Sequence, residues 1–305
     1  MLRQYLSLIR LPNVFTAPTN VLAGYFASTT PNDANGIHLV ALMVSSGLLY
    51  VAGIILNDYF DIEVDKKERP SRPLASGIIK KERAMVVALA ALAAANMICI
   101  LAVNLASFTV SIALSGVIVA YNYRLKWNKI VGPLAMGPAR FLNVILGASP
   151  ALGAIILAYN SEMLYPNLWL ILFAASSLFA YVNSIMLLSK REVIGNTRQV
   201  NIVAFSIVFA VIASMGILGY VVLHFQSTFL INLAIFAAVM IFTFSHYLTA
   251  VSNAEFTQKA IRNMVISIII LDSVVVSGTA GLVYGMASLL FIIPAVVLAK
   301  KMYVT

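Results

Sequence analysis

The chain has 305 residues, of which 61% are hydrophobic and only 10% are charged, and its formal net charge is +9. A soluble domain has about 25% charged residues, so a soluble fold of this length could not cover so much apolar surface with so few charges. The composition therefore excludes an ordinary soluble protein and predicts a polytopic membrane protein. The single cysteine, Cys99, excludes an intramolecular disulfide.

Ten apolar runs approach or exceed the length that a helix needs to cross a bilayer, about 20 residues. They lie at 13–29, 38–56, 84–104, 107–123, 135–158, 167–188, 200–223, 229–250, 264–283 and 286–299. We expect an all-α bundle of nine to ten transmembrane helices, nine if the last two runs form one broken unit. No linker or low-complexity stretch divides the chain, so residues 1–305 are expected to form a single domain.

The basic residues fall on alternate sides of these runs. All 20 lysines and arginines lie at the two ends of the chain or in and beside every second connection. None lies in the connections near residues 31–36, 104–106, 160–166, 224–228 and 284–286. Because Lys and Arg are retained on the cytoplasmic side, both termini are predicted to be cytoplasmic. The positive net charge is therefore accounted for by Lys and Arg in the cytoplasmic connections of a membrane protein, and no nucleic-acid partner is expected.

An acidic segment follows the second run and holds four of the eleven acidic residues: Asn57-Asp58-Tyr59-Phe60-Asp61-Ile62-Glu63-Val64-Asp65. At about 100° per residue, Asp58, Asp61 and Asp65 fall within about 60° of one another on a helix, whereas Glu63 points away. Three carboxylates on one face repel one another unless a cation lies among them. Such oxygen ligands suit Mg²⁺, which binds through one or two carboxylates together with substrate phosphates.

A basic segment comes directly afterwards: Arg69-Pro70-Ser71-Arg72-Pro73-Leu74-Ala75-Ser76-Gly77. Its guanidinium groups are well suited to phosphate oxygens, and its Pro and Gly residues favour turns. Together the two segments predict a metal–diphosphate site at the membrane surface. The alternative is a solvated cytoplasmic loop in which acids and bases merely balance, but the i, i+3, i+7 spacing of the carboxylates favours the site.

The two segments resemble the NDxxDxxxD motif and the following RPLxSG stretch of the UbiA superfamily of intramembrane prenyltransferases. Arg10-Leu11-Pro12-Asn13 and Tyr121-Asn122-Tyr123-Arg124-Leu125-Lys126 are similar to further segments of that family. The resemblance covers the helix layout of essentially the whole chain. It implies a bundle around a central cavity, a side tunnel open to lipid, and Mg²⁺ that binds an isoprenyl diphosphate through aspartates.

The chain departs from the family at its second acidic motif, N-x-x-x-D-x-x-x-D. Asn183 is present, but Leu187 and Arg191 stand at the aspartate positions. A second Mg²⁺ held in the usual way is therefore not expected. Lys190 or Arg191 could neutralise the diphosphate instead, or the site has lost prenyl transfer. This departure, together with the segment 132–143 and the C-terminal tail, most resembles the UbiA-related members found in bacterial Ebo gene clusters.

Asp272 lies inside the ninth apolar run. A carboxylate within the membrane is costly and is a functional candidate by default, here for a proton relay or a transport role. The other reading is a carboxylate bonded to Ser273 or to another helix. His38, His224 and His246 lack the spacing of metal ligands and are taken as structural.

The resemblance implies a Mg²⁺-dependent transfer of an isoprenyl group from a prenyl diphosphate to an aromatic or lipid acceptor within the membrane. Asp58, Asp61 and Asp65 are the expected catalytic and metal-binding residues. The expected substrate-binding residues are Asn13, Asn57, Arg72, Lys126, Arg140, Asn143, Asn183, Lys190 and Arg191. Positive-inside charge for Lys126 and snorkelling of Arg140 to the interface remain open.

The alternative function is a non-catalytic carrier or scaffold that binds a prenylated or anionic lipid or moves a small molecule. Asp272 and the incomplete second motif favour this alternative. The intact first motif favours the enzyme.

Overall fold

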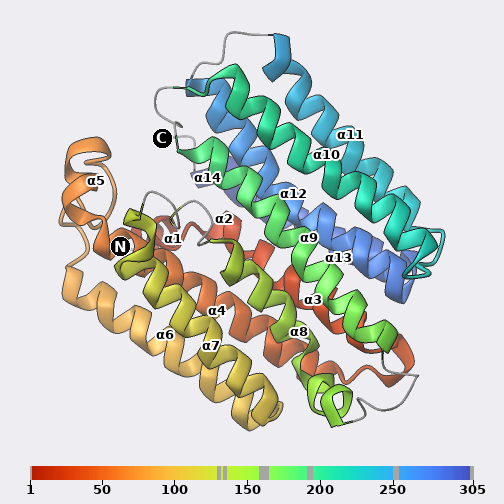
Figure 1. The fold of residues 1–305 in the computed structure, drawn as a ribbon. Helices are drawn as coiled ribbons and strands as arrows, with labels where there is room; N and C mark the ends of the chain where they lie inside the picture. Colours follow the sequence, from red (N-terminus) through yellow and green to blue (C-terminus); the bar gives the residue numbers. More distant parts are fainter. Residues whose placement is uncertain are drawn as a thin grey trace.

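The computed structural model describes residues 2–128, 132, 136–157, 165–190, 195–249 and 254–302, and every regular element in these ranges is helical (Figure 1). The all-α prediction is therefore confirmed. The helices are α1 (Leu2–Leu8), α2 (Leu11–Val14), α3 (Thr16–Ser28), η1 (Pro31–Asp33), α4 (Gly36–Phe60), α5 (Ile62–Glu68), α6 (Lys81–Ala102), α7 (Leu105–Tyr123), η2 (Leu125–Trp127), α8 (Gly137–Leu157), α9 (Tyr165–Ser189), α10 (Arg198–Val221), α11 (Phe229–Thr249), α12 (Ala254–Ala280), α13 (Leu282–Leu289) and α14 (Ile292–Met302).

Seven segments of the described ranges are long and apolar enough to cross a membrane. They are α4, α6, α7, α9 from Leu168 onward, α10, α12 and the stretch Leu282–Ala299, which spans α13 and α14. The other three predicted runs form α3, α8 and α11, which are not among these seven. The chain is thus a multi-pass membrane protein, and the count of nine to ten spans stays a prediction.

Two of the predicted runs are divided in the structure. The first is divided at Phe15 between the short helix α2 and α3, and Arg10, with left-handed backbone angles (φ 46°, ψ 52°), separates α2 from α1 before the run begins. The last is divided between α13 and α14, and Pro294 lies in the first turn of α14, where a missing N–H is tolerated. Gly281, at φ +98°, makes the sharp connection from α12 to α13 that other residues rarely adopt.

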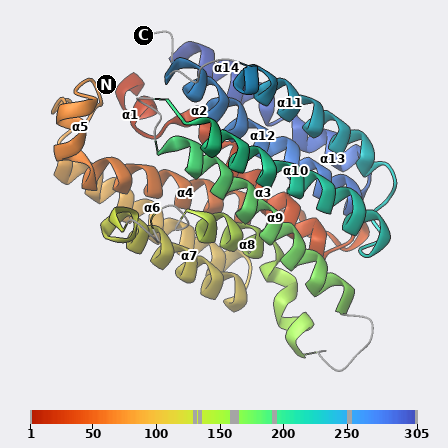
Figure 2. The ribbon, with the colours of Figure 1, turned by 45° about the horizontal axis from the view of Figure 1, so that its top comes forward.

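Helix α3 is central to the bundle. It packs against α4, α8, α9 and α12. Figures 1 and 2 show α4, α6 and α7 grouped on one side of it and α10, α11 and α12 on the other. Side chains from both groups belong to one large buried core.

Glycines bring α3 and α8 together backbone to backbone. A Cβ atom added to Gly24 of α3 would overlap the carbonyl oxygen of Val144, and one added to Gly147 of α8 would overlap that of Val21. Small residues permit such close packing between membrane helices, where packing and hydrogen bonds replace the hydrophobic driving force. The contact holds the first half of α8 against α3, and the polar residues of both helices meet about one to two turns before Gly147.

We expect Gly147→Ala to lower the melting temperature of the detergent-purified protein, because the added methyl group forces α3 and α8 apart. Overpacking of this kind destabilises by about 1–3 kcal/mol. The matched control is Gly116→Ala on α7, where an added Cβ would meet nothing within 4 Å. Alanine is the better helix former, so this control should be neutral or stabilising. Equal melting temperatures for the two variants would contradict the close approach.

Candidate functional site

The carboxylate cluster, defined as Asp58, Asp61 and Asp65, forms at the junction of α4 and α5. The junction falls at Asp61 (φ −94°, ψ 3°), so the chain makes two helices where one continuous helix was assumed. Helical hydrogen bonds still cross the junction, from Asp61 N to Asn57 O and from Asp65 N to Asp61 O. The carboxylates therefore stay on one side. Glu63 points away as predicted, with its side chain 82% exposed and paired with Lys66.

Three cations, Arg10, Arg72 and Lys126, pair with this cluster. Arg10 Nη2 lies 2.8 Å from Asp58 Oδ1. Arg72 Nη1 lies 2.7 Å from Asp65 Oδ2 and 3.3 Å from Asp58 Oδ1, so a single nitrogen bridges two carboxylates. Lys126 Nζ lies 2.6 Å from Asp61 Oδ1 and 3.3 Å from Asn57 Oδ1. Three charges of each sign thus balance locally.

The three cations come from segments that are far apart in the sequence. Arg10 precedes α2, Arg72 lies in the turn after α5, and Lys126 lies in η2 after α7. Arg10 holds backbone angles that are strained for a residue other than glycine, and such strain often accompanies functional sites. Arg72 and Lys126 were predicted as site residues, but Arg10 was not. The available signal was its place directly before the Leu-Pro-Asn segment that resembles the family.

Burial lowers the pKa of Lys126 because its ammonium group loses water. The hydrogen bond and charge of Asp61 oppose this shift, as do the charges of Asp58 and Asp65. The side chain of Lys126 is only 10% exposed, so it is not an ordinary surface lysine of a cytoplasmic loop. Its charge depends on the carboxylates around it.

The donor set suits a Mg²⁺ ion that completes its coordination with a substrate. Asp58 and Asp65 both reach the Arg72 nitrogen, so their oxygens converge on a position that favours positive charge. Within the described ranges, however, no three His, Cys, Asp or Glu side chains lie close enough together to hold a metal ion. One or two carboxylates plus phosphate oxygens are the usual ligands of Mg²⁺ in such sites. Binding by all three aspartates stays a prediction.

Arg140 and Asn143 lie buried in the first turns of α8. Arg140 is 7% exposed, so it does not snorkel to the interface. Its Nη1 donates to Asn20 Oδ1 at 2.8 Å and its Nη2 donates to Thr16 Oγ1 at 2.9 Å. The guanidinium carbon lies 4.9 Å from the centre of the Tyr50 ring.

Asp272 of α12 is bonded to α3. Thr19 Oγ1 and Asn20 Nδ2 each donate to Asp272 Oδ2 at 2.6 Å. The Ser273 hydroxyl instead donates to the Ile270 carbonyl oxygen, so the reading of a carboxylate bonded to another helix is the one observed. A proton-relay or transport role for Asp272 stays a prediction.

A buried polar network therefore joins four helices. Its members are Thr16, Thr19, Asn20, Ser46, Arg140, Asn143 and Asp272. Asn20 accepts from Arg140 and donates to Asp272, so one amide connects the two charged groups. Tyr50, beside Arg140, precedes Asp58 by eight residues, or about 12 Å along α4. The network thus forms a layer beneath the carboxylate cluster.

The remaining predicted site residues are Asn13, Asn183, Lys190 and Arg191. Asn13 is partly exposed in α2, and its carbonyl oxygen accepts from the Thr16 hydroxyl. Asn183 of α9 is 6% exposed, and its Oδ1 has no hydrogen-bond partner in the described ranges. Lys190 is exposed at the end of α9, and Arg191 lies outside the described residues.

We expect Asp272→Asn and Arg140→Gln each to destabilise the protein, because each disrupts the buried network in which Asn20 joins the two charged side chains. Removal of one member leaves buried donors or acceptors of the network unsatisfied, which typically costs roughly 1–3 kcal/mol. The double variant should lose less than the sum of the two single losses, with a coupling of about 0.5–3 kcal/mol. Chemical unfolding of all four proteins in detergent measures this cycle. Strictly additive losses would show that the two charges do not interact.

Comparisons with known proteins extend over most of the chain. The model of the UbiA prenyltransferase family matches residues 17–269. The digeranylgeranylglyceryl phosphate synthase of Saccharolobus solfataricus is 26% identical over 201 residues, which cover 66% of this chain and 64% of that protein. The enzyme of the same name from Sulfurisphaera tokodaii is 32% identical over 147 residues, 48% of this chain and 51% of that protein. The matched stretch thus spans less than two thirds of either relative.

Solved structures share the fold. A digeranylgeranylglyceryl phosphate synthase structure aligns with a TM-score of 0.61 at 20% identity, covering 91% of this chain and 98% of that one. A UbiA homolog from Archaeoglobus fulgidus bound to DMAPP and Mg²⁺ aligns with a TM-score of 0.59 at 16% identity, covering 94% of this chain and 99% of that one. At these identities the likeness establishes the helical architecture.

Proposed function

Because the chain belongs to the UbiA prenyltransferase family, we propose that it transfers an isoprenyl group from a prenyl diphosphate to an aromatic or lipid acceptor, with Mg²⁺ as cofactor. The observation that carries the proposal is the carboxylate cluster met by three cations from three separate segments. Two findings support the substrate class: the relatives named digeranylgeranylglyceryl phosphate synthase, and the homolog bound to DMAPP and Mg²⁺. The relatives' name favours a lipid acceptor over an aromatic one.

We propose that residues 1–305 act as a single domain.

The carboxylates and the cations have complementary tasks in this proposal. Asp58, Asp61 and Asp65, with Asn57 beside them, would hold Mg²⁺, which when bound supplies positive charge to the departing diphosphate. Arg10 and Arg72 present planar guanidinium forks that suit phosphate oxygens, and Lys126 adds a compact charge. Without substrate the two sets neutralise each other, so a magnesium–diphosphate pair offers each set a new partner.

The three cations could also replace the positive charge that the incomplete second motif no longer brings through a metal ion. The family's second aspartates would bring further positive charge through a metal, and this chain has Leu187 and Arg191 at those positions. We propose that Arg10, Arg72 and Lys126 take over that task, with Lys190 and Arg191 as additional candidates. Asn183, whose buried Oδ1 has no partner among the described residues, is proposed as a substrate ligand.

The buried polar network forms the floor of the proposed site. Arg140 and Asn143 donate within the network, so we propose that they support the site from below and contact the part of the substrate that reaches deepest. Asn13, in α2 near Arg10, is proposed to line the entrance. The apolar bundle around these groups would exclude water from the allylic cation that remains when diphosphate departs.

A non-catalytic carrier of a prenylated or anionic lipid is the second candidate function. Leu187, in place of an aspartate, favours it. Such a carrier would bind the diphosphate group and release it unchanged. The same departure is the basis for proposing that the chain falls among the Ebo-cluster members of the family.

The proposed site is tested by the binding of geranylgeranyl diphosphate to the detergent-purified protein with and without Mg²⁺. We expect Asp61→Asn to weaken Mg²⁺-dependent binding by more than about 10–100-fold, the loss seen when only the supports of metal ligands are removed. The matched control is Glu63→Gln, since Glu63 belongs to the same segment but faces solvent. The proposal fails if binding ignores Mg²⁺, or if both variants bind as the wild type does.

The role of the cations is tested by Lys126→Met beside Lys190→Met. Loss of a buried charged donor should weaken diphosphate binding by about ten-fold or more, because hydrogen bonds to charged groups contribute roughly 1.5–3 kcal/mol. Lys126→Arg should retain most of the affinity. Lys190 is exposed, and a comparable loss in Lys190→Met would move part of the task to the second-motif position. Wild-type affinity in Lys126→Met would contradict the assignment of Lys126.

A further inference from the structure

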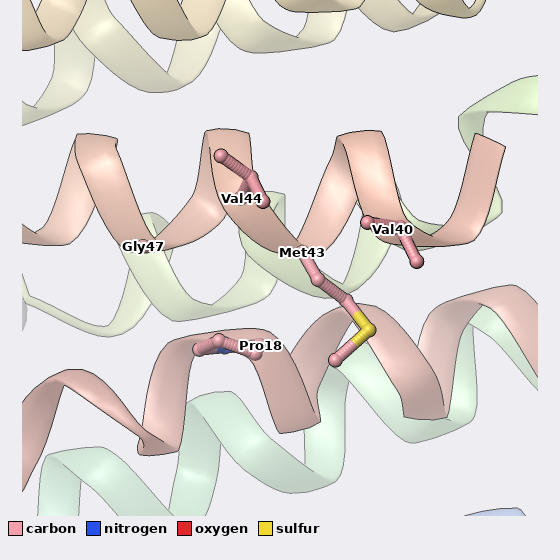
Figure 3. A pocket seen from close by; sticks show the side chains of 5 residues that line it. All are labelled: Pro18, Val40, Met43, Val44 and Gly47. Carbon is pink, nitrogen blue, oxygen red and sulfur yellow. The ribbon is translucent and has the colours of Figure 1, made fainter. Parts of the chain in front are cut away.

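The outer surface of the bundle is apolar along its spans. One part of this surface is a hollow of about 310 Å³ between α3 and α4, lined by Pro18, Val40, Met43, Val44 and Gly47 (Figure 3). None of these five residues has a polar side chain, and Val40 and Val44 are 61% and 49% exposed. Such a surface can contact acyl chains, but it has no group that distinguishes one lipid headgroup from another.

Cations gather at the end of the bundle that carries the carboxylate cluster. Residues 66–83 hold seven Lys and Arg residues against two Glu residues. Figures 1 and 2 show α5 beyond the end of the bundle, beside the start of α6. Lys66 lowers the pKa of Glu63 through a hydrogen bond and through its charge. The charges of Lys67 and Lys81 lower the same pKa further, so the end of α5 lies within electrostatic range of the start of α6.

Four of these cations have no counter-charge. We call them the cationic rim: Lys67, Lys80, Lys81 and Arg83. All four side chains are exposed. In the part of the chain that the structure describes, no carboxylate lies within ion-pair distance of any of them. The cations of the carboxylate cluster are paired, whereas those of the rim are available to an anion from outside the chain.

An apolar side chain stands out beside the rim. Ile78 is 54% exposed, whereas the next residue, Ile79, is buried. The backbone N–H of Ile79 donates to the Pro73 carbonyl oxygen, and Gly77 supplies the left-handed φ of +74° that the turn needs. The turn therefore holds Ile78 outward, two residues before Lys80. Apolar side chains among Lys and Arg are typical of segments at the boundary between lipid headgroups and acyl chains.

The rim is continuous with the lipid-facing surface of α6. This helix begins at Lys81 and is long and apolar enough to cross a membrane. Arg83 lies one helical turn before Val86 and Val87, which are 65% and 39% exposed. Side chains lean toward the N-terminus of their helix, so the cations of α6 lean away from these apolar residues. A molecule that contacts both surfaces must join an anionic group to apolar chains.

We propose that the cationic rim binds the headgroups of anionic phospholipids, with Ile78 inserted among the first acyl carbons and the outer face of α6 in contact with the acyl chains. A zwitterionic phospholipid carries its own ammonium group and offers the rim no net charge, whereas an anionic one does. Each Lys or Arg near an anionic membrane surface strengthens binding by about five-fold. The inference is independent of the proposed function, because it uses no residue of the carboxylate cluster.

The test places a fluorescent label at position 78 of the full chain, as Ile78→Cys with Cys99→Ala, since Cys99 is the only native cysteine. The protein is reconstituted in phosphatidylcholine vesicles with a minor share of brominated phosphatidylglycerol or, separately, of brominated phosphatidylcholine, whose bromine atoms quench the label on contact. We expect both lipids to quench the label, and phosphatidylglycerol to associate about five-fold or more tightly. High salt should weaken this preference, because it screens surface charges.

Two variants and a second labelling site serve as controls. Lys80→Gln combined with Lys81→Gln and Arg83→Gln should abolish the preference, whereas Lys80→Arg combined with Lys81→Arg should keep it. The second label replaces Ile202, which is 44% exposed on α10, one turn after Arg198. A single cation begins that span, so we expect both lipids to quench this label with little preference.

Three results would overturn the inference. If neither lipid quenches the label at 78 while both quench the label at 202, the turn lies in water. Equal quenching by the two lipids at 78, or a preference that survives the triple Gln variant, would show that the rim does not select the headgroup. Loss of the preference when inorganic phosphate is added at constant ionic strength would identify a site for soluble anions instead. None of these results bears on the binding of prenyl diphosphates.

Discussion

The structure depends on the mutual neutralisation of Asp58, Asp61 and Asp65 by Arg10, Arg72 and Lys126. Carboxylates this close would repel one another strongly at the low dielectric of a buried site. Arg72 alone bridges Asp58 and Asp65, Arg10 pairs with Asp58 while it adopts a strained backbone conformation, and Lys126 pairs with Asp61. The pairing joins the segments before α2, after α5 and after α7 at one end of the bundle. A Mg²⁺ ion bound to a diphosphate fits this end of the bundle. The metal would offer positive charge to the three carboxylates, and the diphosphate would offer negative charge to the three cations.

The layer beneath the cluster is held by backbone packing and by buried polar groups. Gly24 and Gly147 allow α3 and α8 to touch, and this contact seats Arg140 against Thr16 and Asn20. Through Asn20 the network reaches Asp272 and so ties α12 to the helices that carry the site. Asp272 therefore has a structural role, because it accepts hydrogen bonds from Thr19 and Asn20 and belongs to the same network as the buried Arg140.

The parts of this site that were predictable from sequence are the local ones. The register of Asp58, Asp61 and Asp65 and the outward direction of Glu63 follow from helical periodicity, and Arg72 lies close enough in the chain for its proximity to be expected. The junction at Asp61 was not predictable, because a helix can continue or turn there with the same hydrogen bonds. The Asn20–Asp272 bond joins residues 252 positions apart, and no pattern in the sequence encodes it. Arg10 likewise shows its role only when α2 is folded against α4.

The central claim is that this end of the bundle performs chemistry on a prenyl diphosphate. It is tested most directly by the release of inorganic diphosphate when the purified protein is incubated with geranylgeranyl diphosphate, Mg²⁺ and a series of lipid and aromatic acceptors. We predict acceptor-dependent release that requires Mg²⁺ and is lost in Asp61→Asn. Tight, Mg²⁺-dependent binding with no release for any acceptor would contradict catalysis and identify the protein as a carrier.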